Sequence, residues 1–233
     1  TKVLADAFLC KDGLPVEKSA YKVEYLPAGK EFENRDPRMA LTLWKPGDPF
    51  LGKPFVPNLS SQTRTGYMFK KYGDEESYSN MKSRIDEILI RYAEVLLGYL
   101  ECLVEDNQTI TQGTLDETIN AVRGRASVKM PVITEVNPAK LREIVRHERR
   151  IELAMEGIRY WDIMRWGIAH EVLSQKIWGA PYPNSTQYAT TTKEVDPTGK
   201  CRWYVGKRAF RNPTDYTWPI PQSEQNINPN LRD

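Results

Sequence analysis

A dense cluster of charged residues lies between positions 146 and 165. Glu148, Glu152 and Glu156 recur at four-residue spacing, so a helix would stack their carboxylates on one face. Arginine suits their neutralisation, because its planar fork binds a carboxylate through two hydrogen bonds. Two kinds of chemistry fit this cluster: a network of ion pairs that locks two helices together, or a carboxylate active site. The residues of the predicted structural network are Glu148, Arg149, Glu152, Arg159, Asp162 and Arg165.

A glycoside hydrolase is the enzymatic alternative, because it works with two paired carboxyl groups. One of them must donate a proton, which requires a raised pKa. The neighbouring arginines favour the ionised form instead, so we prefer the structural network. His147 precedes Glu148 without the second histidine of an HExxH motif, and the sequence contains no GxSxG motif and no phosphate-binding glycine loop. We therefore predict no catalytic residue.

The composition narrows the function further. The formal net charge of +2 over 233 residues argues against a broad nucleic-acid surface, and no apolar run reaches membrane-spanning length. Three widely spaced cysteines fit neither a disulfide framework nor a zinc site. The acidic run Asp74-Glu75-Glu76 lacks the alternating oxygen ligands of a calcium loop and fits a solvated turn better. The sequence predicts neither a metal nor a cofactor.

Two helices are expected to carry the charged cluster. Asn137 can cap the first of them, and Pro138 suits its first position because the missing N–H would be unpaired there. Gly157 is a natural left-handed residue at its end. A second helical run, from 158 to about 174, follows at once, so the two helices meet at a tight turn.

Two earlier helices, at about 84–104 and 115–127, form another predicted hairpin. The first carries a wide apolar stripe. The second begins with a capping box made by Thr114 and Glu117. The prediction is a mostly α protein with a helical core of two hairpins over residues 84–174.

Long loops flank this core. Residues 1–83 are rich in glycine and proline, and only short strands fit there, at Tyr21–Tyr25 and Met39–Trp44. Residues 175–233 return to loop, and their proline-rich end is expected to pack on the helices. We expect the loop-rich segments 1–83 and 175–233 to form one domain with the helical core of residues 84–174.

Aromatic residues without a periodic partner are concentrated in the flanking loops. A sugar ring can stack its C–H face on tryptophan or tyrosine while polar side chains bind its hydroxyl groups. The alternative for each ring is a loop anchor that plugs the core. The candidates for ligand binding are Trp44, Tyr67, Trp178, Tyr182 and Trp203.

Four motifs, taken in order, resemble the SusD/RagB family of outer-membrane nutrient-binding proteins of the Bacteroidetes. Residues 91–97 read RYAEVLL and residues 120–126 read NAVRGRA. Residues 148–166 read ERRIELAMEGIRYWDIMRW, and WPIP begins at Trp218. Each motif is weak by itself, but the occurrence of all four in the family's order argues against chance.

The resemblance implies a SusD-like fold with tetratricopeptide-like packing of helical hairpins, long irregular loops and a few short strands. It also implies a non-catalytic lipoprotein, exposed at the cell surface on the outer membrane. Such a protein binds a nutrient, with a glycan as the leading ligand and a peptide still open, and delivers it to a SusC-like TonB-dependent transporter. A helical-repeat scaffold that binds only protein is the alternative function, followed by a glycoside hydrolase.

Members of the family carry a lipid anchor and helical repeats near the N-terminus. The sequence shows neither feature, so we expect it to be the C-terminal part of a longer protein, truncated at its N-terminus. Membrane attachment would then depend on a lipid anchor outside this chain.

Overall fold

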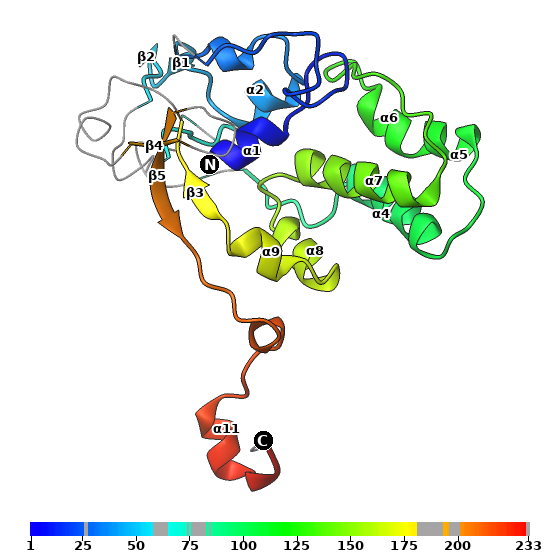
Figure 1. Cartoon of the computed structure of the whole chain (residues 1–233), viewed down its shortest axis with the longest axis vertical. Helices are drawn as coiled ribbons and strands as arrows, with labels where there is room; N and C mark the ends of the chain where they lie inside the picture. The colour runs from blue at the N-terminus through cyan, green and yellow to red at the C-terminus, as the bar shows by residue number, and fades with distance from the viewer. Residues whose placement is uncertain are drawn as a thin grey trace.

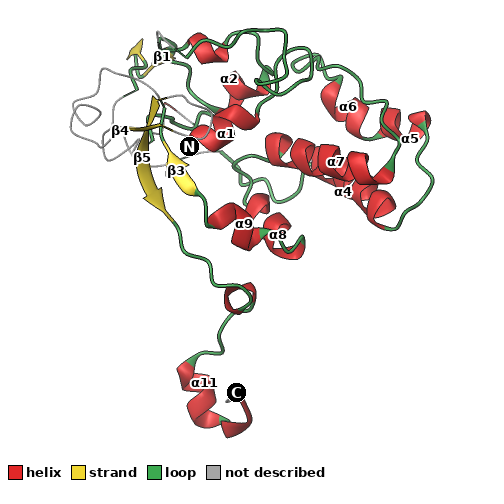
Figure 2. Cartoon of the chain, viewed as in Figure 1, coloured by secondary structure: helices red, strands yellow, loops and turns green. Residues whose placement is uncertain are grey.

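The structure is a computed structural model. It describes residues 1–25, 28–57, 65–73, 75, 83, 85–180, 193–195 and 201–231, with the backbone alone at 193–195 and 201–204. The described part is mostly helical with a few short strands (Figure 2), which confirms the predicted fold class. Its α-helices are α1 (Lys2–Ala7), α2 (Arg38–Thr42), α4 (Tyr92–Glu105), α5 (Gln112–Glu117), α6 (Ile119–Arg123), α7 (Pro138–Glu152), α8 (Ile158–Arg165), α9 (Ala169–Leu173) and α11 (Gln222–Ile227).

The larger hydrophobic core lies where α4 packs along α7, with α5 and α6 against the same pair (Figure 1). As predicted, Asn137 caps α7: its side-chain oxygen accepts a hydrogen bond from the Lys140 amide at 3.2 Å. Pro138 is the first residue of α7. The fully buried leucines and isoleucine of this core are Leu97, Leu100, Leu115, Ile119 and Leu141.

The first two predicted helices differ from the structure at their ends. Helix α4 begins only at Tyr92, because Arg91 is extended and turns its side chain toward the carboxylates of α7. The second predicted helix is divided at Thr118 into α5 and α6. Its cap is Thr111 rather than Thr114, and the Thr111 hydroxyl accepts a hydrogen bond from the Thr114 amide at 3.1 Å.

Gly157 has the predicted left-handed conformation, with φ of 77°, and separates α7 from α8. The predicted fourth helix does not run unbroken to about residue 174. Gly167, with φ of 71°, divides it into α8 and α9. Glycine adopts this backbone conformation at little cost, so it is a natural point for a break.

The smaller core joins α1 and α2 to Ile151 at the end of α7 and to Ala180. The strand predicted at Met39–Trp44 is wrong, because α2 occupies most of this range. Asp36 lies two residues before the helix, and its Oδ1 accepts a hydrogen bond from the amide of Arg38, the first residue of α2, at 2.9 Å. The segment Tyr21–Tyr25, where another strand is predicted, forms none. A 3₁₀ turn, η1 (Lys30–Phe32), lies between α1 and α2.

The strands of the described residues form two small antiparallel sheets. One is a hairpin of β1 (Pro49–Phe50) and β2 (Lys53–Pro54). In the other, β5 (Cys201–Lys207) lies between β3 (Lys176–Trp178) and β4 (Lys193–Val195).

Beyond β5 the chain extends away from the body, through η2 (Thr214–Tyr216), α11 and η3 (Pro229–Leu231) (Figure 1). The packing on the helices that we expected for this segment is limited among the described residues: the Tyr216 hydroxyl lies 2.8 Å from Nδ1 of His170 on α9, but Trp218 is 73% exposed. Within the described part of the chain, no helix is both long enough and apolar enough to cross a bilayer.

Candidate functional site

Glu148 on α7 is the most deeply buried carboxylate of the charged cluster, with a side chain only 1% exposed. Arg38 binds one of its oxygens, and Arg123 Nη1 donates to the other at 2.7 Å. Asp36 in turn orients Arg38, whose Nη2 donates to the Asp36 carboxylate at 2.7 Å. A charge removed from water needs such partners, because desolvation costs several kcal/mol per ion.

Glu152, one turn further along α7, joins three different parts of the chain. Its carboxylate accepts hydrogen bonds from Arg38 Nη1 at 3.1 Å, Arg91 Nη1 at 3.0 Å and Arg125 Nη2 at 2.7 Å. Burial acts to raise the pKa of Glu152, but the charges of Arg125, Arg38 and Arg91 outweigh it and hold this pKa below its ordinary value. The carboxylate is therefore ionised at neutral pH.

Glu156 extends the same row of carboxylates beyond the end of α7. Arg91 binds it through Nε at 2.9 Å and Nη2 at 2.7 Å, and Lys71 Nζ lies 2.5 Å from it. Burial again acts to raise the pKa of Glu156, and the hydrogen bonds and charges of Arg91 and Lys71 lower it overall. All three stacked glutamates are thus neutralised by cations from outside α7.

A second group of ion pairs joins α4, α7 and α8. Arg149 on α7 forks around Asp162, with Nη2 3.0 Å from Oδ1, and its Nε lies 3.3 Å from a Glu101 oxygen. Arg165 donates to both oxygens of Glu101, at 2.7 and 2.6 Å, and to Asp162 at 2.7 Å. Trp166 completes the group by donating its indole N–H to Glu101 at 2.5 Å.

Five of the six residues predicted for the network lie in these two groups. Arg159 does not: it forms no ion pair within 4 Å with a described residue, and its guanidinium lies 5.6 Å from the Trp166 ring centre. Sequence reasoning missed the arginines that bind Glu148 and Glu152. Three of them lie in or beside the motifs quoted above, and an arginine inside an apolar helical stripe is the signal that could have indicated them. They are Arg38, Arg91, Arg123 and Arg125.

The aromatic residues predicted to bind ligand have different surroundings. Trp44, Tyr67 and Trp178 are between 6% and 8% exposed, so none presents a free ring face in this chain. The Tyr67 hydroxyl donates to Glu31 at 2.9 Å, and Trp44 packs 5.1 Å from the Phe50 ring. Tyr182 and the side chain of Trp203 lie outside the described residues, and the Trp203 backbone belongs to β5. Their role in ligand binding stays a prediction.

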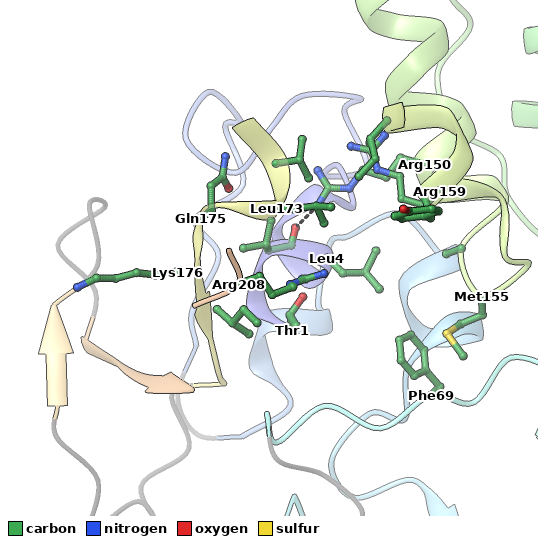
Figure 3. A pocket seen from close by; sticks show the side chains of 16 residues that line it. Thr1, Leu4, Phe69, Arg150, Met155, Arg159, Leu173, Gln175, Lys176 and Arg208 are labelled. Carbon is green, nitrogen blue, oxygen red and sulfur yellow. Dashed lines mark hydrogen bonds between the residues drawn. The ribbon is translucent and has the colours of Figure 1, made fainter. Parts of the chain in front are cut away.

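A cavity of about 370 Å³ lies beside α1, α8, α9 and β3 (Figure 3). Its wall is largely apolar, with residues such as Leu4, Tyr160 and Leu173. Three arginines also line it, Arg150 from α7, Arg159 from α8 and Arg208 just after β5, and no carboxylate belongs to its described lining. No sequence pattern indicates this cavity, because its wall is assembled from segments far apart in the chain.

No group of three potential metal ligands is found among the described residues. The clustered carboxylates described above, Glu101, Glu148, Glu152, Glu156 and Asp162, are bound by arginine and lysine. The described part of the chain therefore combines a helical body stabilised by buried ion pairs with the largely apolar cavity that Arg150, Arg159 and Arg208 line.

The chain belongs to the SusD family, whose model matches residues 1–233. A crystal structure of a SusD-like carbohydrate binding protein from Bacteroides fragilis is 63% identical, with a TM-score of 0.83, and the match covers 99% of this chain and 47% of that chain. A second SusD-like protein from Bacteroides fragilis is 27% identical, with a TM-score of 0.69, over 96% of this chain and 44% of that chain.

SusD-like protein P38 from Formosa agariphila is 30% identical over 47% of this chain and 27% of that protein. The chain thus spans about half the length of the similar solved structures, and about a quarter of this curated relative. The match of the whole chain to the family nevertheless agrees with the resemblance seen in its four motifs.

The first prediction compares two arginines of α7 that both bind α4. Arg149→Met should lower the free energy of unfolding by about 3 kcal/mol, because Glu101 and Asp162 would remain buried with fewer partners. Arg142→Met is the matched control, since Arg142 binds the more exposed Glu105, and it should cost less than about 1 kcal/mol. Denaturant unfolding measures both, and equal costs would contradict a buried structural role for Arg149.

The second prediction concerns the buried aromatic residues. Trp178→Ala should lower the free energy of unfolding by about 3 kcal/mol, because truncating a buried aromatic side chain leaves a cavity. Tyr67→Phe, a smaller change that removes only the hydroxyl bound to Glu31, should cost about 1–3 kcal/mol. A variant that kept full stability but lost ligand retention would instead identify that ring as a binding platform.

Proposed function

We propose that the protein is a non-catalytic, surface-exposed component of nutrient uptake at the outer membrane. Its leading ligand is a glycan, which it delivers to a SusC-like TonB-dependent transporter. The observation that carries this proposal is the match of the whole chain to the SusD family, together with the 63% identity to a SusD-like carbohydrate binding protein. The transporter as a partner and the outer-membrane location rest on the family alone.

The state of the carboxylates supports a binding role over a catalytic one. A glycoside hydrolase requires a carboxylic acid that holds its proton near neutral pH. The pKa values of Glu101, Glu152 and Glu156 are instead held below their ordinary value: burial acts to raise each of them, but hydrogen bonds and charges of neighbouring cations outweigh it. These groups favour folding over proton transfer.

A protein-binding scaffold is the second candidate, and one observation favours it. Helix α4 leaves Tyr92, Val95 and Tyr99 more than half exposed, and their spacing of three and four residues places them on one face of the helix. An exposed apolar stripe of this kind is typical of a helix that packs against another protein surface.

A panel of immobilised polysaccharides tests the proposed function, with reducing-end release measured in parallel. The full-length protein should be retained by at least one glycan without releasing new reducing ends. Retention with cleavage would indicate a hydrolase. If no glycan retains the protein, the glycan-binding function is contradicted and the scaffold is favoured.

A further inference from the structure

The cavity beside α8 has the size and the walls of a small-ligand site. Its volume of about 370 Å³ falls in the range of small-molecule pockets, which are mostly apolar with a few convergent polar groups. Here the apolar part comes from α1, α8, α9 and β3. The polar groups are three guanidinium groups together with Thr1, Gln175 and Lys176. Figure 3 shows Arg150 and Arg159 on the side of the helices and Arg208 on the side of the strands.

The charge of this cavity is not balanced by the described residues that line it. Neither Arg150, Arg159 nor Arg208 has a carboxylate partner within 4 Å among the residues described. The acidic groups that act on them from further away are already bound: Asp162 by Arg149 and Arg165, and Asp6 by Lys2. This contrasts with Glu152, where three arginines meet one carboxylate.

Burial makes the imbalance costly for Arg150 in particular. Its Nη2 donates to the Val3 carbonyl at 3.0 Å, and no further partner is found among the described residues. Burial and then the nearby charge of Arg159 lower the pKa of Arg150 to about 10. An anion in the cavity would relieve this repulsion, since a buried charge gains most from a close opposite charge.

The same cavity offers an apolar surface beside its cations. Tyr160, which is 38% exposed, lines the cavity together with Leu173 and Ile177. A sugar ring has an apolar C–H face that packs on such groups, whereas inorganic phosphate would use none of them. The arrangement therefore favours a ligand with one anionic group on a ring.

We propose that this cavity binds an acidic sugar residue, whose carboxylate is held by Arg159 and Arg208 while its ring packs against Tyr160. Arginine suits the task because its fork matches a carboxylate with two parallel hydrogen bonds. This inference rests on the proposed glycan-binding function and names its substrate class: a glycan that contains uronic acid residues.

The test compares an oligogalacturonate with its methyl ester, which keeps the ring and removes the charge. Calorimetry on the full-length protein should give an affinity for the acid at least about tenfold higher, the difference expected from one charge-assisted hydrogen-bonded pair. Arg159→Gln and Arg208→Gln should each remove most of that preference. Arg142→Gln is the matched control, because it removes one arginine charge of α7 elsewhere, and it should preserve the preference.

Thermal unfolding of each variant separates loss of binding from loss of fold. Arg159 and Arg208 suit this comparison, because neither forms an ion pair with a described residue. Equal affinity for the acid and its ester would overturn the acidic-sugar site. The proposed glycan-binding function would still stand if a polysaccharide of the panel retains the protein. A preference for a sulfated oligosaccharide over the carboxylated one would also overturn it. Failure of every glycan in the panel would contradict the proposed function itself.

Discussion

The fold depends on removing the carboxylates of one helix from water and neutralising them there. Glu148 and Glu152 lie on the buried face of α7, where an unpaired charge would cost several kcal/mol. Their partners come from α2, from the residue before α4, and from α6 with the residues just after it: Arg38, Arg91, Arg123 and Arg125. Each ion pair therefore also fixes the position of a distant segment against α7.

Hydrophobic burial alone would not hold these segments in one arrangement. The larger core joins α4, α5, α6 and α7, and the smaller core joins α1 and α2 to the end of α7. Arg38 on α2 links the two hydrophobic cores. It binds Asp36 just before α2, and it also binds Glu148 and Glu152 on α7. Charge pairing of this kind is directional, so it supplies the register that apolar contacts leave open. A network that serves this purpose leaves its carboxylates ionised and unsuited to donating protons.

Sequence reasoning succeeded where the relevant information is local. Asn137 and Pro138 mark the start of α7, and Gly157 immediately precedes α8, because capping and left-handed conformations depend on single residues. Helix α7 itself ends earlier than predicted, at Glu152. The four-residue spacing of Glu148, Glu152 and Glu156 is likewise visible in the sequence alone. The alternation of apolar residues at Met39–Trp44 led to a wrong strand prediction, because six residues are too few to separate a strand from the short helix α2.

The candidate site could not be derived in the same way. Arg38 and Glu148 lie 110 positions apart, so only the fold brings them together. A loop tryptophan such as Trp44 gives the same signal whether it plugs a core or faces solvent, and its burial is a property of the packed molecule. The arginine-lined cavity likewise joins α1, α7, α8 and the end of β5, whose residues share no sequence pattern.

The titration of the buried carboxyl groups tests this account most directly. Carbon-13 NMR of the glutamate side chains, assigned with Glu152→Gln and Glu156→Gln, would follow each group with pH. We expect both carboxyl groups to titrate below 4.5, the ordinary glutamate value, because the bound cations stabilise the ionised form. Because these pKa values are lower in the folded state, the ionised carboxylates contribute their full stability above the ordinary glutamate pKa of 4.5. That contribution is lost as the pH falls through the folded-state pKa. A carboxyl of this group that kept its proton to about pH 6, as a general acid must, would contradict the structural role of the network.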